Sequence, residues 1–175
     1  MESIKIIIKD ELETTNCFKS KLFGSASISE KDIKTINDKL FLLAQIKLSE
    51  LPKNGILPDE GILYFFISED GNIGKVIYSL DFDLSKDFYK ISNFKSFSIE
   101  FIKERRAEGL KMLGKPLELN KDFPSDEVLL LQYDPYEDNR LEFLSTIDGV
   151  VYFSIKKRDL KRKRFDKAFV TKDFT

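Results

Sequence analysis

Two stretches of this chain are nearly the same strand written twice: residues 61–68 read GILYFFIS, and residues 149–156 read GVVYFSIK. Gly, Tyr, Phe and Ile stand at the same four places in both. Side chains alternate between the two faces of a β-strand, so each stretch presents one continuous apolar face. We predict that this face lies in the core in both copies; it carries Leu63, Phe65 and Ile67 in the first, and Val151, Phe153 and Ile155 in the second.

The opposite faces of the two stretches differ. The first copy carries only large apolar or aromatic side chains there, namely Ile62, Tyr64 and Phe66, whereas the second carries Val150, Tyr152, Ser154 and Lys156. We therefore expect the first strand to be covered on both sides and the second to be half-exposed. In that arrangement Tyr152 and Lys156 would meet solvent.

The similarity extends well beyond the two octapeptides. KLFG at 21–24 matches KMLG at 111–114, and KLFLLAQIKL at 39–48 matches EVLLLQYDP at 127–135, aligned on Gln45 and Gln132. The offset stays between 87 and 90 residues, which favours an internal duplication over chance. We predict a single domain over residues 1–175 built from two structural repeats, at about 20–90 and 110–170. One repeat of about 85 residues would bury a core only marginally by itself.

The remaining local patterns are mostly those of strands and turns. SEDGNIG at 68–74 predicts a hairpin turn after the first octapeptide, since Asp70 and Gly71 suit the positive φ angles of a tight turn. Ser29 followed by Asp32 predicts a short, capped helical turn. From these patterns we predict an α+β fold with internally duplicated, mainly antiparallel β-sheet halves and few short helices.

Composition sets broad limits on class and setting. With 175 residues, 42% of them hydrophobic, the chain can bury a core. The 29 basic and 30 acidic residues nearly cancel, so overall charge selects neither a nucleic acid nor a basic partner. Cys17 has no partner for an intramolecular disulfide, and no apolar run approaches the ~20 residues of a membrane span. We predict a cytoplasmic protein with no membrane contact.

The residue types needed for many reactions are missing. The chain has no histidine, which removes Ser-His, Cys-His and His-metal mechanisms. The acidic run DPYEDN at 134–139 lacks the register of a calcium loop. The acids of DFD at 81–83 favour a solvated strand end over a general acid/base pair. We therefore predict no catalytic residue, no metal ion and no cofactor.

Several blocks together resemble a known family. These are SKLFG, LLAQIKLSELP, LPDEGILYFFIS, GKVIY, LLLQYD, DGVVYFSIKKRDL and RFDKAFV, in this order between Ser20 and Val170. The sequence is similar to the YwqG-like bacterial proteins, whose function is unassigned. The resemblance implies an α+β fold with internally duplicated, strand-rich halves.

The chain also departs from that family's pattern. YwqG-like proteins usually carry tryptophans, one of them just before the Asp-x-Gly of the second repeat, but this chain has none and reads STIDG at 145–149. Ser25 stands where the family usually has a second glycine after SK-x-G. A ligand site built on those aromatic residues would be lost in this copy.

Gln45 and Gln132 each interrupt an otherwise apolar strand. A buried amide must find hydrogen-bond partners, because leaving it unpaired costs roughly 1 to 3 kcal/mol. The first interpretation is that each amide holds the backbone of a neighbouring loop. The second is that the two form paired ligand contacts. Asp148, just before the glycine of the second octapeptide, is similarly open between a turn residue and a contact residue.

The segment KKRDLKRKR is the most basic in the chain, with seven cationic residues in nine. Such a run could meet phosphates or an acidic protein, but no aromatic residue interrupts it, so base stacking is not indicated. A solvated surface segment, partly neutralised by acids between Asp134 and Glu142, is the alternative. The candidate contacts are Lys156, Lys157, Arg158, Lys161, Arg162, Lys163 and Arg164, beside Tyr152.

From these observations we predict a non-catalytic binding module whose partner is another protein. An immunity-type protein that neutralises a toxin is its specific form. One alternative is an enzyme that uses carboxylates such as Asp81, Asp134 or Asp148 with Lys or Tyr in a concave pocket. Another is weak RNA binding through residues 156–164, although nucleic acid is disfavoured as a partner. The oligomeric state is left open.

Overall fold

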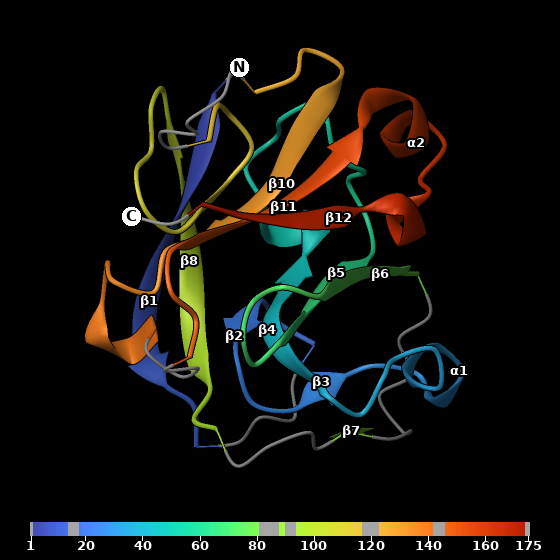
Figure 1. Ribbon diagram of the computed structural model, residues 1–175, viewed down its shortest axis with the longest axis vertical. Coiled ribbons are helices and arrows are strands. Elements are labelled where there is room, and N and C mark those ends of the chain that lie inside the picture. Colours follow the sequence, from blue (N-terminus) through green and yellow to red (C-terminus); the bar gives the residue numbers. More distant parts are fainter. Residues whose placement is uncertain are drawn as a thin grey trace.

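The computed structural model describes residues 2–13, 18–80, 88–89, 94–116, 123–141 and 146–173. Ten strands form one sheet in the order β12-β11-β10-β9-β1-β8-β2-β4-β5-β6, and the short strands β3 and β7 form a second sheet (Figure 1). The strands of the large sheet are β1 (Ser3–Glu11), β2 (Lys21–Leu22), β4 (Leu40–Lys47), β5 (Ile62–Ser68), β6 (Gly74–Ser79), β8 (Phe97–Glu104), β9 (Lys111–Met112), β10 (Glu127–Tyr133), β11 (Val150–Lys156) and β12 (Phe169–Asp173). Those of the small sheet are β3 (Ala26–Ser27) and β7 (Phe88–Tyr89).

Helices contribute little to this architecture. α1 (Glu30–Ile33) has four residues and α2 (Lys157–Lys161) has five. The other helical segments are single 3-10 turns, η1 (Leu48–Glu50), η2 (Asn139–Leu141) and η3 (Phe165–Lys167). As expected, Ser29 caps α1, because its side chain accepts a hydrogen bond from the Asp32 N–H. None of the helices in the described segments has the length and apolar character needed to cross a membrane.

The predicted α+β class with two sheet halves is wrong. The fold is mainly antiparallel β, in one nearly closed, barrel-like sheet. The halves do not separate because β1 pairs with β8 over most of its length, from Ser3 opposite Glu104 to Glu11 opposite Phe97. This central pair joins β2, β4, β5 and β6 on one side to β9, β10, β11 and β12 on the other. Strands with matching sequences therefore lie at mirrored places in one sheet; the repeat boundaries stay a prediction.

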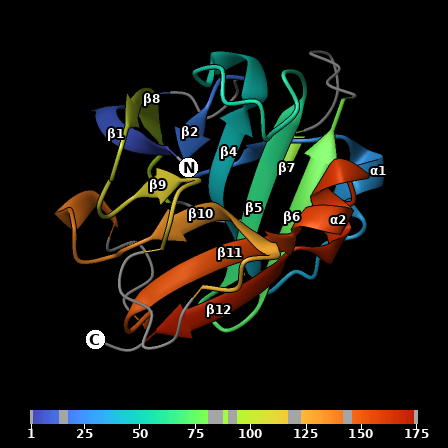
Figure 2. The ribbon, with the colours of Figure 1, turned by 90° about the horizontal axis from the view of Figure 1, so that it is seen from above.

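The two end strands of the sheet, β6 and β12, lie against each other, and so do the η3 and hairpin-turn segments next to them. The rings of Tyr78 and Phe165 lie 5.1 Å apart, and Lys172 Nζ donates to the Asp70 carbonyl at 3.0 Å. A side chain at Gly74 would place its Cβ 2.2 Å from a methyl group of Val170, so glycine is needed there for the strands to approach. Figure 2 shows the sheet curled, with β11 and β12 passing across β5 and β6.

The two octapeptides meet in the core. The rings of Phe65 and Phe153 pack edge to face with centroids 5.3 Å apart, an arrangement that aromatic pairs favour. All six residues of the predicted core faces are buried in one cluster, which confirms that prediction. Burying each of the two Phe side chains stabilises the fold by roughly 1.5 to 3 kcal/mol.

The prediction that the second octapeptide is half-exposed is wrong. Tyr152 is 2% exposed and Ser154 is 1% exposed. Leu129, Val150 and Tyr152 form a small apolar cluster, with Phe123 packed against it. The sequence of the strand alone could not show that a segment 27 or more residues upstream covers this face. Only Lys156, at the strand's end, is partly exposed.

The predicted hairpin is confirmed. β5 and β6 pair from Ile62 opposite Ser79 to Ile67 opposite Gly74. The turn between them contains Gly71 at φ +74°, and the Asp70 carboxylate accepts a hydrogen bond from the Asn72 N–H at 3.1 Å. Cys17 and the DFD acids Asp81 and Asp83 lie outside the described residues.

Candidate functional site

A buried lysine and a buried glutamine face each other across β2 and β4. Lys21 pairs with Gln45, and both are 0% exposed. Gln45 Nε2 donates to the Lys19 carbonyl at 2.9 Å, and its Oε1 accepts from the Ser27 N–H at 2.9 Å. Lys21 Nζ donates to the Ser25 carbonyl at 2.5 Å. These bonds tie the segments on either side of β2 to β4.

The same arrangement occurs in the other half of the sheet, where Lys111 on β9 pairs with Gln132 on β10. Gln132 Nε2 donates to the Gly109 carbonyl at 2.7 Å. Lys111 Nζ donates to the carbonyls of Ala107 at 2.6 Å and Lys115 at 2.7 Å. The acceptors Lys19 and Gly109, like Ser25 and Lys115, are 90 positions apart, as are the two lysines.

A carboxylate completes each cluster. Glu50 Oε2 accepts a hydrogen bond from the Ser20 N–H at 2.9 Å, and Glu137 Oε2 accepts one from the Leu110 N–H. Glu50 and Glu137 are 87 positions apart, the same offset as the glutamines. We call the two sets the Lys21 cluster (Lys21, Gln45 and Glu50) and the Lys111 cluster (Lys111, Gln132 and Glu137).

The lysines close tight turns at the ends of β2 and β9. Phe23 and Leu113 adopt φ of +56° and +58°, a left-handed conformation that costs roughly 1 to 3 kcal/mol in a residue with a side chain. Each Nζ reaches the carbonyl four residues ahead, beyond that strained residue. Burial lowers the pKa of Lys111, while the nearby Glu108 carboxylate acts in the opposite direction. A caged, desolvated ammonium is suited to holding backbone in place.

One cation distinguishes the two clusters. Lys5 on β1 lies opposite Lys111; its Nζ binds the Glu137 carboxylate and donates to the Glu108 carbonyl at 2.5 Å. The residue opposite Lys21 on β8 is Ser98. The Lys111 cluster therefore has an additional ion pair to the N-terminal strand.

The two glutamines lie as the first interpretation requires, each holding the backbone of a loop. Both are fully buried, so a ligand could reach them only if those loops opened; paired ligand contact stays a prediction. Sequence reasoning missed the lysines and glutamates of the clusters. The signal was present, because the lysine begins both KLFG and KMLG and the acids share the offset of the glutamines.

The predicted basic segment begins at the end of β11 and continues through α2. Lys156 binds Asp126 at 3.0 Å and Glu127 at 2.7 Å, and these two acids raise the pKa of its ammonium, Glu127 most strongly. Arg158 and Arg164 lie 3.5 and 3.8 Å from the buried Asp159. The acids that neutralise this segment thus lie at the start of β10, immediately before β10, and within α2.

Among the described acids between Asp134 and Glu142, none pairs with the basic segment; Glu142 lies outside the described residues. Within the described part of that stretch, Glu137 pairs with Lys5 and Asp138 pairs with Arg140 at 2.6 Å. The Asp134 carboxylate accepts from the Tyr136 N–H at 3.0 Å. Each of these acids is held by a local or N-terminal partner and not by the basic segment.

Four cations of the segment remain without an ion pair to any described residue. They are Lys157, Lys161, Arg162 and Lys163, all exposed, and we call them the basic ridge. Their backbone is anchored by Leu160, 7% exposed, and Phe165, 1% exposed. The Arg162 N–H donates to the Asp159 carbonyl at 3.1 Å and the Lys163 N–H to the Leu160 carbonyl at 2.8 Å. The ridge is thus a fixed surface feature.

Tyr152 and Asp148 lie in different environments. Burial raises the pKa of Tyr152 to about 12. Asp148 is exposed and accepts a hydrogen bond from the Tyr136 hydroxyl at 3.1 Å, which raises the pKa of Tyr136. Asp134 binds the backbone N–H of Tyr136 and not its hydroxyl, and Tyr136 is 61% exposed on a surface turn. Partner contact by Asp148 and Tyr152 stays a prediction.

No described group of three or more cysteine, aspartate and glutamate residues could hold a metal ion. The fold and the clusters define a class of mainly antiparallel, barrel-like β-protein in which each side of the sheet carries a buried Lys-Gln pair with a surface glutamate beside it. The chain belongs to the family described as "Domain of unknown function (DUF1963)", whose sequence model matches residues 20–122 and 93–173. A comparison with curated proteins gives no match.

Proposed function

We propose that this protein is a non-catalytic binding module that docks an acidic protein partner on the basic ridge. The observation that carries the proposal is the set of four exposed cations without ion pairs to described residues, held on anchored backbone. A partner would contact Lys157, Lys161, Arg162 and Lys163, with Arg158 and Arg164 at the margin.

Two properties of the basic ridge favour binding: its ordered backbone and its local charge. The backbone of the ridge is already ordered by Leu160 and Phe165, so docking loses little conformational freedom. Local positive charge on a chain of net charge −1 also steers an acidic surface toward this face and accelerates association. Lys156 is less available, because Asp126 and Glu127 already pair with it.

The arrangement of the ionisable groups supports a module over an enzyme. The two buried lysines, Lys21 and Lys111, are bound to backbone carbonyls. Asp148 and Tyr136 lie on an exposed turn, where no wall excludes water from a reaction. In its specific form the proposal is a YwqG-like bacterial immunity protein of the cytoplasm, with a toxin as the acidic partner.

The test compares two variants of equal net charge. In the ridge variant, K157E, K161E, R162E and K163E are combined; in the control, the exposed Lys31, Lys53, Arg105 and Arg106 are changed to Glu. Binding to immobilised poly-L-glutamate is measured by interferometry at about 50 and about 200 mM salt. We expect the ridge variant to bind roughly tenfold or more weakly than the control.

Two results would overturn this proposal. Equal losses in the two variants would show that only overall charge matters. Tighter binding to poly(U) RNA than to poly-L-glutamate, lost in the ridge variant alone, would assign the ridge to nucleic acid. If the acidic probe binds as expected, co-purification with the product of the neighbouring gene, lost in the ridge variant only, tests the toxin-neutralising form.

A further inference from the structure

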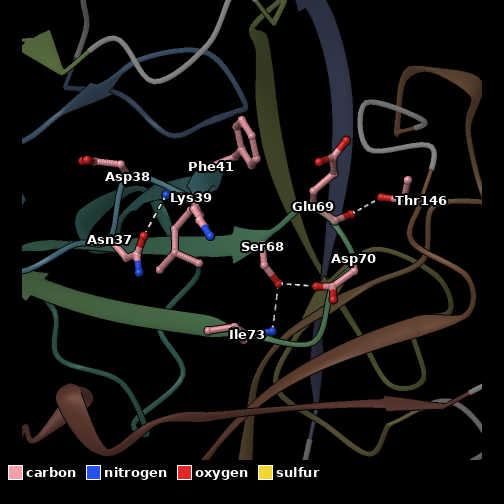
Figure 3. Close-up of a pocket in the computed structure, with 10 residues that line it drawn as sticks. Asn37, Asp38, Lys39, Phe41, Ser68, Glu69, Asp70, Ile73 and Thr146 are labelled. Atoms are coloured by element: carbon pink, nitrogen blue, oxygen red, sulfur yellow. Dashed lines mark hydrogen bonds between the residues drawn. The ribbon is translucent and has the colours of Figure 1, made fainter.

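A cavity of about 760 Å³ opens between the start of β4 and the tip of the β5–β6 hairpin, and it reaches Thr146 (Figure 3). Its apolar side chains are Leu40, Phe41 and Ile73, and its acids are Asp38, Glu69 and Asp70. We call it the acidic groove. The volume falls within the range of sites that take a small ligand or a few side chains of a peptide.

The backbone around the groove is fixed by short hydrogen bonds. The Ser68 hydroxyl donates to the Asp70 carboxylate at 2.6 Å and accepts from the Ile73 N–H at 2.9 Å (Figure 3). Thr146 Oγ1 donates to the Glu69 carbonyl at 2.5 Å, which joins the hairpin tip to the segment just before the second octapeptide. A ligand would therefore meet a groove whose shape is already set.

The apolar part of the groove is open to solvent. Ile73 is 63% exposed, the largest value among the large apolar side chains of the described residues. Phe41 is partly buried, and its ring packs edge to face on Phe94 at 5.7 Å. An apolar side chain of a partner could cover Ile73 and the open side of Phe41, which would remove apolar surface from water.

The charge of the groove is negative. Three carboxylates and one cation, Lys39, are among the residues that line it, and the Lys172 ammonium lies beside it on the Asp70 carbonyl. Hydrogen bonds from Ser68 and Asn72 lower the pKa of Asp70 to about 2, so this group is ionised at neutral pH. Glu69 has no ion pair with a described residue, and Figure 3 shows its side chain directed away from the hairpin tip. A cation beside an apolar anchor is the complementary ligand.

We propose that the acidic groove binds a basic peptide segment of a partner protein. An apolar side chain of the peptide packs on Phe41 and Ile73, and a flanking Lys or Arg side chain pairs with Glu69. This site is separate from the basic ridge and has the opposite charge, so it extends the molecule's contacts beyond the proposed function.

The test uses a fluorescein-labelled peptide, Lys-Lys-Phe-Leu-Lys-Lys, and fluorescence anisotropy. Two further peptides carry Ser-Ser in place of Phe-Leu, or Glu in place of every Lys. The chain variants are E69K and I73D, with E104K and I102D as matched controls, because Glu104 and Ile102 are exposed on β8 and do not line the groove. Thermal melting of each variant checks that it is folded.

We expect the basic apolar peptide to bind, the two altered peptides to bind at least about tenfold more weakly, and E69K and I73D to weaken binding by roughly fivefold or more. The ridge variant should bind this peptide as the wild type does, which separates this proposal from the previous one. Equal binding of the Ser-Ser peptide, no binding, or equal effects of the control variants would overturn the proposal. A dimer in light scattering that dissociates in E69K would make a second copy of the chain the occupant, and would also overturn it.

Discussion

The Lys21 and Lys111 clusters hold corresponding backbone groups with corresponding side-chain atoms, but among the described residues only the Lys111 cluster has an ion pair to the N-terminal strand. In both, a lysine closes a left-handed turn, a glutamine holds the loop before the strand and a glutamate accepts an N–H from that loop. Within the described part of the chain, Lys5 adds an ion pair to the Lys111 cluster and no ion pair joins the Lys21 cluster to β1. The shared bonds are therefore scaffold, and the additional ion pair is specific to one side.

The same division holds at the surface. β5 and β6 are joined by a tight turn, whereas β11 and β12 are joined by α2 and η3. The basic ridge lies on the longer connection, and the acidic groove lies beside the tight turn. The two sides of the sheet thus have the same buried arrangement of side chains, but their exposed connections, which a partner could reach, are different.

The largest effect should come from removing the buried ammonium groups. In the K111M variant, the carbonyls of Ala107 and Lys115 lose their donor, and in K21M the Ser25 carbonyl loses one. We expect each change to lower the free energy of unfolding by about 1 to 3 kcal/mol, as measured by urea denaturation. The exposed K53M variant is the control. A stability equal to that of K53M would show that the lysines do not support the turns.

Much of the fold could be predicted from local patterns in the sequence. Alternation predicted the buried faces that carry Phe65 and Phe153, and Asp70-Gly71 predicted the hairpin, because side-chain periodicity and turn chemistry are local properties. The joining of the halves could not be predicted in this way. It depends on β1 pairing with β8, about 90 residues away in sequence, and no pattern within either strand specifies that partner.

The site was predicted less well than the fold. Gln45 and Gln132 were identified because an amide in an apolar strand stands out, but no pattern singled out their lysine partners. Lysine is rarely buried fully, so residue type alone does not predict that these two lysines are buried. Their burial is explained by the backbone carbonyls that surround each ammonium in the folded chain. The acidic groove is formed by segments near residues 40, 70 and 146, which a reading along the chain does not bring together.

A smaller effect is expected at the ion pair that distinguishes the clusters. In the K5M variant, Glu137 keeps its bond from the Leu110 N–H but loses its cation. Because both side chains are partly exposed, we expect a loss of about 1 kcal/mol or less in the free energy of unfolding, reduced further at high salt. K9M, which removes the exposed ion pair of Lys9 with Glu100 between β1 and β8, is the comparison. If K5M destabilises as much as K111M, the ion pair belongs to the shared scaffold and the distinction fails.

The smallest effect is a change of stability with pH that belongs to Lys111. Burial lowers its pKa in the folded chain below the ordinary 10.5, so between these two values the unfolded chain binds more protons than the folded chain. The contribution of Lys111 to stability must then increase as pH rises through that window. Urea denaturation of the wild type and K111M from about pH 8 to about pH 10.5 isolates this contribution, because the tyrosines are common to both. We expect the stability of the wild type relative to K111M to grow with pH. Its stability relative to Q132L, which changes no ionisable group, should not change with pH. A wild-type advantage over K111M that falls with pH would mean that the carbonyl cage raises the pKa of Lys111 and outweighs burial.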